Sequence, residues 1–82
     1  MRLFDITKNH QIVCESENTR YGFRHVAHLT YNGVEYTKEK SCYYNRTWEA
    51  HEFDSVMLKL ADKISKDEPA IAFAIKKFVR NR

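Results

Sequence analysis

The sequence predicts one α+β domain over residues 1–82, with an antiparallel sheet of three to four strands followed by two helices. Its first half contains short runs of alternating apolar and polar residues, separated by turn residues, which is typical of β-hairpins. Its second half contains two apolar stripes with helical spacing, and the first of these helices is expected to cover the sheet. A chain of 82 residues is too short for two ordinary domains.

The composition is that of a folded chain. Hydrophobic residues make up 43% and aromatic residues 13%, with only two glycines and one proline. No run of about 18 apolar residues is present, so no membrane-spanning helix is expected. An acid at position 5 precedes any signal-peptide core, which predicts a cytoplasmic protein. In that compartment Cys14 and Cys42 are expected to be buried thiols.

The first two strands are expected at residues 3–7 and 11–15, joined as a hairpin through the polar residues 8–10. The next segment, residues 15–20, is polar throughout and therefore predicts a surface loop.

Asn32-Gly33 is the strongest local signal, because both central residues of a type I′ turn need positive φ and this dipeptide provides it. The register of the surrounding hairpin follows by counting outward from the turn. One face then carries the pairs Tyr31–Val34, Leu29–Tyr36, Ala27–Lys38, His25–Lys40 and Phe23–Cys42.

This face is the more apolar of the two and is expected to lie on the core, although it includes Lys38 and Lys40. Two arrangements accommodate these lysines. Either the hairpin projects beyond its covering helix, or a bulge shifts the register after Tyr36.

The first helix is expected to have Thr47 as its N-cap and Glu49 and Glu52 near its positive end. Its apolar stripe consists of Phe53, Val56, Met57, Leu60, Ala61 and Ile64. Pro69 suits the first turn of the second helix. The apolar stripe of that helix consists of Ile71, Ala74, Ile75, Phe78 and Val79.

The sequence favours neither a catalytic nor a metal site. His25 and His28 are three residues apart on a strand, so their side chains are expected on opposite faces. Cys42 is diagonal to His25, but the sequence offers no glycine-rich loop for an oxyanion hole and no group to orient the histidine. We therefore expect a non-enzymatic protein without cofactor or metal.

The second helix carries the best candidate binding surface. On a helical wheel Phe73 falls opposite the apolar stripe, among Lys76, Lys77 and Arg80, and Arg82 follows. An aromatic side chain among cations suits an acidic protein patch or a stacked base. Alternatively, Phe73 fills a crevice of its own fold, or the helix packs against a second copy in a homodimer.

Arg46 is the second candidate, near Lys38 and Lys40 at the junction between hairpin and helix. An arginine there suits a phosphate bound close to the helix N-terminus. Alternatively, Arg46 forms an ion pair with Glu49 or Glu52.

Residues 42–49, Cys-Tyr-Tyr-Asn-Arg-Thr-Trp-Glu, followed by Phe53 and Val56-Met57-Leu58, resemble a segment of small uncharacterised proteins of bacteriophages and related mobile elements. The resemblance covers the middle of the chain and neither end. It implies a compact accessory protein in the cytoplasm of an infected bacterium, which binds and inhibits or modulates a host protein such as a defence nuclease (an anti-CRISPR-like role) or a polymerase. The alternative is a small basic nucleic-acid-binding protein, which a formal net charge of +3 allows. Physically, Trp48 is expected to wedge between hairpin and helix.

Overall fold

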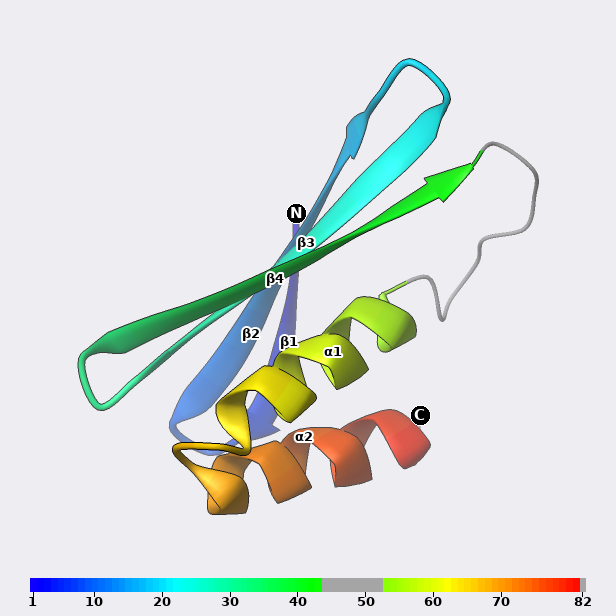
Figure 1. The fold of residues 1–82 in the computed structure, drawn as a ribbon. Coiled ribbons are helices and arrows are strands. Elements are labelled where there is room, and N and C mark those ends of the chain that lie inside the picture. Colours follow the sequence, from blue (N-terminus) through cyan, green and yellow to red (C-terminus); the bar gives the residue numbers. More distant parts are fainter. Residues whose placement is uncertain (44–52, 82) are drawn as a thin grey trace.

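The computed structural model describes the backbone of residues 1–43 and 53–81, and the side chains of 1–41 and 53–81. Its elements, in chain order, are β1 (Arg2–Thr7), β2 (His10–Asn18), β3 (Gly22–Tyr31), β4 (Val34–Tyr43), α1 (Asp54–Ile64) and α2 (Pro69–Arg80). The strands form one four-stranded antiparallel sheet in the order β1-β2-β3-β4 (Figure 1). The predicted α+β class and its order of elements are confirmed.

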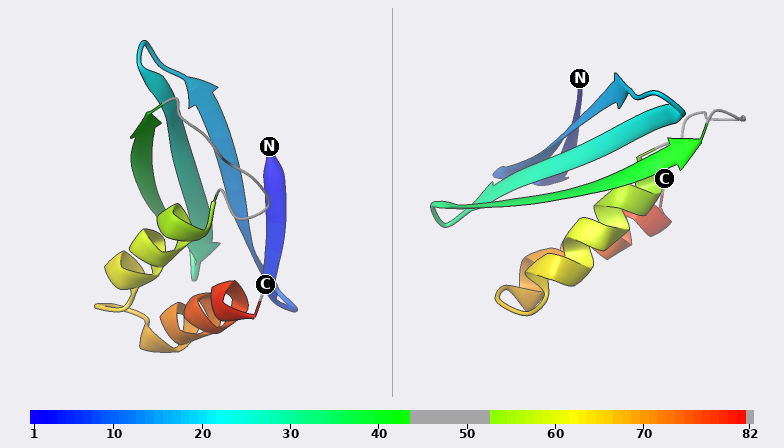
Figure 2. Two further views of the ribbon diagram at one scale, coloured as in Figure 1. Left: turned by 90° about the vertical axis from the view of Figure 1, so that its right-hand side faces the viewer. Right: turned by 45° about the horizontal axis from the view of Figure 1, so that its top comes forward.

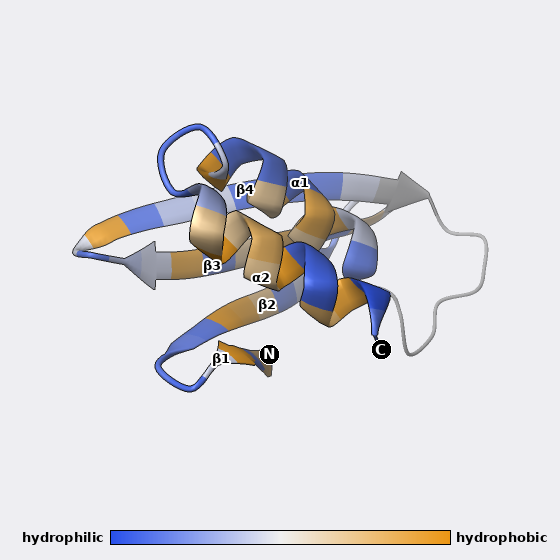
Figure 3. Ribbon diagram, turned by 90° about the horizontal axis from the view of Figure 1, so that it is seen from below, coloured by the Kyte–Doolittle hydropathy of each residue, from blue (hydrophilic) through white to orange (hydrophobic). Residues whose placement is uncertain are grey.

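The two helices lie on the same side of the sheet, so the domain has two layers (Figure 2). α1 packs against β3 and β4, while α2 packs against α1 and reaches β1. Seen from the helical side in Figure 3, hydrophobic and hydrophilic residues alternate along both helices, as expected when one side of each helix faces a core. No described element covers the other face of the sheet (Figure 2). Within the described residues, no helix has the length and apolar character needed to cross a membrane.

The β3–β4 hairpin has the predicted turn and the predicted register. Asn32 and Gly33 have φ values of 53° and 79°, and all five predicted pairs are present, with no register shift between the two strands. The bulge proposed after Tyr36 is therefore wrong. β4 is an edge strand, and α1 leaves Lys38 exposed beside it. Lys40 is half-buried, and its Nζ donates a hydrogen bond of 2.6 Å to Ser55 Oγ in α1.

The surface loop predicted over residues 15–20 is wrong for most of its length, because β2 continues to Asn18. Its last residues pair with β3 and make contacts between side chains as well as between backbones. Ser16 Oγ lies 2.5 Å from Nδ1 of His25, and Glu17 forms an ion pair with Arg24. Cross-strand partners thus stabilise a segment whose own composition favours a loop.

α1 begins later than the sequence predicted. Its N-cap is Phe53 and its first-turn acid is Asp54, so the assignment of Thr47 as the cap of this helix is wrong. Thr47, Trp48, Glu49 and Glu52 lie outside the described residues. The apolar stripe is confirmed, since every member is buried: Phe53, Val56, Met57, Leu60, Ala61 and Ile64.

α2 begins at Pro69, as predicted. Ile71 and Ile75 of its stripe are buried. The other members, Ala74, Phe78 and Val79, are partly buried against the core. Ala72, which the stripe did not include, is also buried. The buried side is wider than one stripe because α2 packs against both α1 and β1.

Tyr36 of β4 joins the sheet to the connection between the helices. Burial raises the pKa of its hydroxyl above the usual value of 10.0, as do the charges of Asp67 and Glu68 and a hydrogen bond to Asp67. The folded state therefore favours the neutral phenol. This contribution to stability is complete below the unfolded pKa of 10.0 and is lost as the pH rises through the raised pKa of the folded state.

We therefore expect the free energy of unfolding to fall on the alkaline side of pH 10, and to fall less in Tyr36→Phe. Urea denaturation of both proteins across that range measures the difference. Parallel pH profiles for the two proteins would show that Tyr36 does not contribute in this way.

Candidate interaction surface on the helical layer

The two histidines of β3 point to opposite faces of the sheet, as predicted. His25 is buried on the core side, where its ring lies 5.0 Å from that of Phe53 in an edge-to-face arrangement. His28 lies on the uncovered side, with its ring nitrogens 3.6 Å from a carboxylate oxygen of Glu15 and 3.8 Å from one of Glu35. Among the side chains of residues 1–41 and 53–81, no three potential ligands are grouped to hold a metal ion. The sulfur of Cys42 lies outside the described side chains.

The exposed side of α2 presents one aromatic ring among cations. Phe73 is 63% exposed and makes no ring contact with any residue that the structure describes. The suggestion that it fills a crevice of its own fold is therefore wrong. Lys76 and Lys77 are one turn further along the helix and thus neighbours of Phe73 on its surface. Arg80 is also exposed.

An ion pair extends this exposed side onto α1. Nζ of Lys76 lies 3.2 Å from a carboxylate oxygen of Asp62. Leu58, one turn before Asp62, is 39% exposed and adds a second apolar side chain. We call this set the α2 surface: Leu58, Asp62, Phe73, Lys76, Lys77 and Arg80.

A second group of cations lies beside the seam between α1 and β4. Lys66 lies in the turn that follows α1, and Lys59 and Lys63, four residues apart, share one side of the helix. That side faces β4, because Nζ of Lys63 donates a hydrogen bond of 3.0 Å to the Thr37 carbonyl oxygen. These three lysines line a groove of about 380 Å³ together with Lys38 and Asp62. We call it the lysine groove.

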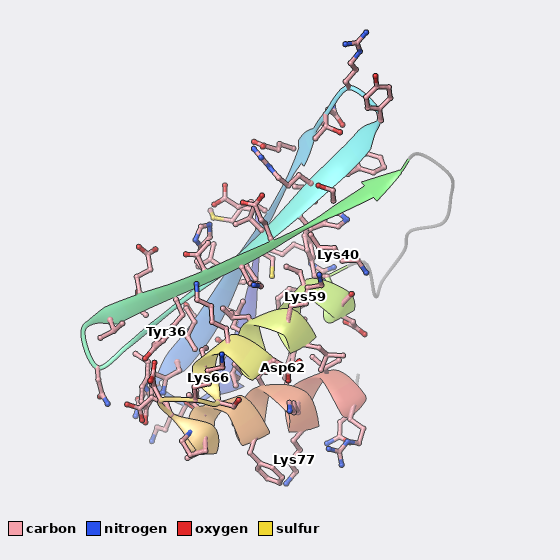
Figure 4. The ribbon with its side chains drawn as sticks, viewed as in Figure 1. Tyr36, Lys40, Lys59, Asp62, Lys66 and Lys77 are labelled. Atoms are coloured by element: carbon pink, nitrogen blue, oxygen red, sulfur yellow. The ribbon has the colours of Figure 1, made fainter. Side chains whose placement is uncertain are left out.

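Figure 4 shows both groups. The labelled Lys40, Lys59 and Lys66 follow the seam between α1 and β4, Asp62 lies between the two helices, and Lys77 projects from the far side of α2.

The predicted binding residues thus fall into three sets. Phe73, Lys76, Lys77 and Arg80 lie together on α2, as expected. Lys38 and Lys40 lie on β4, away from them and closer to α1. Arg46 and Arg82 lie outside the described residues.

Lys59, Lys63 and Lys66 were not predicted as binding residues from the sequence. Lysines three or four residues apart are typical of any solvent-exposed side of a helix, so their spacing alone does not indicate a site. Their convergence on Lys38 depends on which side of α1 faces β4, and the packing of the helix decides that.

Charge is distributed unevenly between the two layers. The uncovered face of the sheet carries mostly acids: Glu15, Glu17, Glu35 and Glu39. Arg24, a cation on that face, pairs with both Glu17 and Glu39, at 3.7 Å from the latter. The helical layer carries the α2 surface and the lysine groove. An anionic partner is therefore attracted to the helical layer and repelled by the opposite face.

No known family model, curated protein or solved structure matches this chain.

Proposed function

We propose that this chain is a non-enzymatic accessory protein of a phage or mobile element, which binds a bacterial host protein and inhibits or modulates it. The proposal rests on Phe73, which is 63% exposed. An exposed ring flanked by cations is typical of the anchors that dominate protein interfaces. The phage context comes from the resemblance of residues 42–49.

The α2 surface suggests the chemistry of the partner. Phe73 and Leu58 offer apolar area, whereas Lys77 and Arg80 offer positive charge at its border. A complementary surface has a shallow apolar pocket surrounded by acids, as on a defence nuclease or a polymerase that presents acidic side chains near its active site. Such a surface binds the ring by burial and orients it by charge.

A pull-down from nuclease-treated bacterial lysate tests the proposal. The wild-type chain is expected to retain a host protein in stoichiometric amount. The double variant Phe73→Ala with Lys77→Glu removes an anchor worth about 2 kcal/mol or more, and is expected to bind roughly 30-fold more weakly. Both positions are exposed, so the variant is expected to fold like wild type.

A matched control is Leu3→Ala with Lys8→Glu, which makes the same two kinds of chemical change at exposed positions of the sheet layer. It is expected to capture the host protein as wild type does. If wild type retains no host protein, or if the α2 double variant retains it undiminished, the proposed function is wrong.

Nucleic-acid binding is the second candidate function. It is supported by the concentration of cations on the helical layer, to which Arg46 and Arg82 add two charges in sequence. Phosphate contacts weaken steeply with salt, whereas anchoring by a buried ring does not. A gel-shift series between about 50 and 200 mM salt separates the two functions. Absence of any shift at the low-salt end excludes this candidate.

A further inference from the structure

The lysine groove gathers four positive charges from two elements. Lys38 comes from β4, and Lys59, Lys63 and Lys66 come from α1 and the turn that ends it. None of the four forms an ion pair with any residue that the structure describes. Their side chains are all exposed.

The one acid among the groove's described lining residues does not balance this charge. Asp62 lines the groove, but its carboxylate is 3.2 Å from Nζ of Lys76 on α2. Lys59 and Lys63 are four residues apart on α1, and like charges at this spacing repel each other by a few tenths of a kcal/mol. The sheet face shows the opposite arrangement, in which Arg24 is paired with acids. The lysine groove thus keeps an unbalanced positive charge in a concave place.

We propose that the lysine groove binds a run of closely spaced phosphate groups. Lysine ammonium groups bind phosphate as compact point charges with three donors each. From Lys59 to Ile64, where α1 ends, the helix rises by about 7.5 Å at ~1.5 Å per residue, and Lys66 lies in the turn beyond. The ammonium groups of the groove are therefore spread over a length that accommodates more than one phosphate.

The lining also determines how the ligand is recognised. The groove residues are four lysines and one aspartate, with no aromatic ring among these described residues on which a base stacks. Binding is therefore independent of base sequence. The same chemistry accepts either the backbone of a nucleic-acid strand or a free phosphate chain. The site does not use Phe73, so it goes beyond the protein-binding role proposed for the α2 surface.

Fluorescence anisotropy of the full chain with a labelled single-stranded oligonucleotide tests the site. With three to four phosphate contacts, affinity is expected to fall roughly 20- to 50-fold between about 50 and 200 mM salt. Unlabelled inorganic triphosphate is then added as a competitor. If triphosphate displaces the strand at a concentration similar to the Kd of the strand, the ligand is a free phosphate chain. If displacement needs triphosphate in large excess over that Kd, the ligand is a nucleic-acid strand.

The decisive variants are two doubles with equal change of net charge. Lys59→Glu with Lys66→Glu alters the groove at two exposed side chains, so the fold is preserved. It is expected to weaken oligonucleotide binding at low salt by at least about tenfold. Lys8→Glu with Arg20→Glu alters exposed charges of the sheet layer and is expected to weaken it by less than about threefold.

Two results would overturn the proposal. Equal losses of oligonucleotide affinity in the two double variants mean that the electrostatic field of the whole protein, rather than the groove, attracts the strand. Binding of neither probe by wild type excludes a phosphate site. If wild type binds neither probe, and the groove double loses the captured host protein, the groove belongs to the protein interface. Circular dichroism and melting temperature confirm that each variant is folded. The capture assay with Phe73→Ala and Lys77→Glu is scored separately, so either proposal can fail alone.

Discussion

Replacing Phe4 by alanine is expected to lower the free energy of unfolding by about 3–5 kcal/mol. Phe4 of β1 is only 6% exposed, and it packs against the N-cap residue of α1 and against α2. Its ring centroid lies 6.2 Å from that of Phe53 and 5.9 Å from that of Phe78, both in edge-to-face geometry. A domain of this length has a total stability of about 4–12 kcal/mol. The variant is therefore expected to lose a large share of that stability and to unfold at a markedly lower urea concentration than wild type.

Urea denaturation measures this change, and Phe73→Ala is its matched control. The same atoms are deleted, but from a ring that is 63% exposed. The control is expected to stay within about 0.5 kcal/mol of wild type. Equal losses at the two positions would show that Phe73 is buried in solution, which contradicts its role as a docking anchor.

Leu60→Ala is expected to cost about 2–5 kcal/mol. Leu60 is fully buried at the middle of α1, where the helix packs against the sheet and α2. Removing the outer carbons of its side chain leaves a cavity that the neighbouring side chains fill only in part, and that adds to the lost transfer free energy.

Leu58→Ala is the control for this change, because Leu58 is on the same helix and is 39% exposed. We expect it to cost less than about 1 kcal/mol, since much of its surface is already in water. Thermal melting of wild type and the two variants side by side distinguishes the cases. A Leu60 variant that melts with the Leu58 variant would mean that α1 is not packed as described.

Parts of the fold could be predicted because local residues determine them. Asn32-Gly33 fixes a turn by its backbone preference, and the period of two along a strand then carries the register to Cys42. The stripe of α1 could be predicted because six apolar residues repeat with the helical period. These features depend on residues close together in the chain.

The extension of β2 to Asn18 could not be predicted in this way. Its last residues are polar on both sides, and only their pairing with β3 makes them a strand. Glu17 acquires Arg24 as a partner, and Ser16 acquires His25, through the ladder itself. Both partners, Arg24 and His25, lie in β3, so the residues of the segment itself do not reveal these contacts.

One part of the candidate site could likewise be predicted from the sequence, and another part could not. The exposure of Phe73 followed from the wheel of α2 alone. The lysine groove depends on the packing of α1 beside β4, which brings Lys38 to Lys59 and Lys66 from a distant part of the chain. No periodicity within one element contains that information.

The hydrogen bond from Lys63 to the Thr37 carbonyl has a consequence for the behaviour of concentrated protein. Thr37 is in the edge strand β4, next to the hydrogen-bonded pair Leu29–Tyr36, so its carbonyl points away from β3 and toward solvent. An unpaired row of such carbonyls is a template for the strand of another molecule, and growth from it leads to aggregates. Lys63 occupies one of these acceptors, and a strand that docks there must displace its charge. The lysines beside β4 thus protect the chain from its own copies as well as attracting an anion.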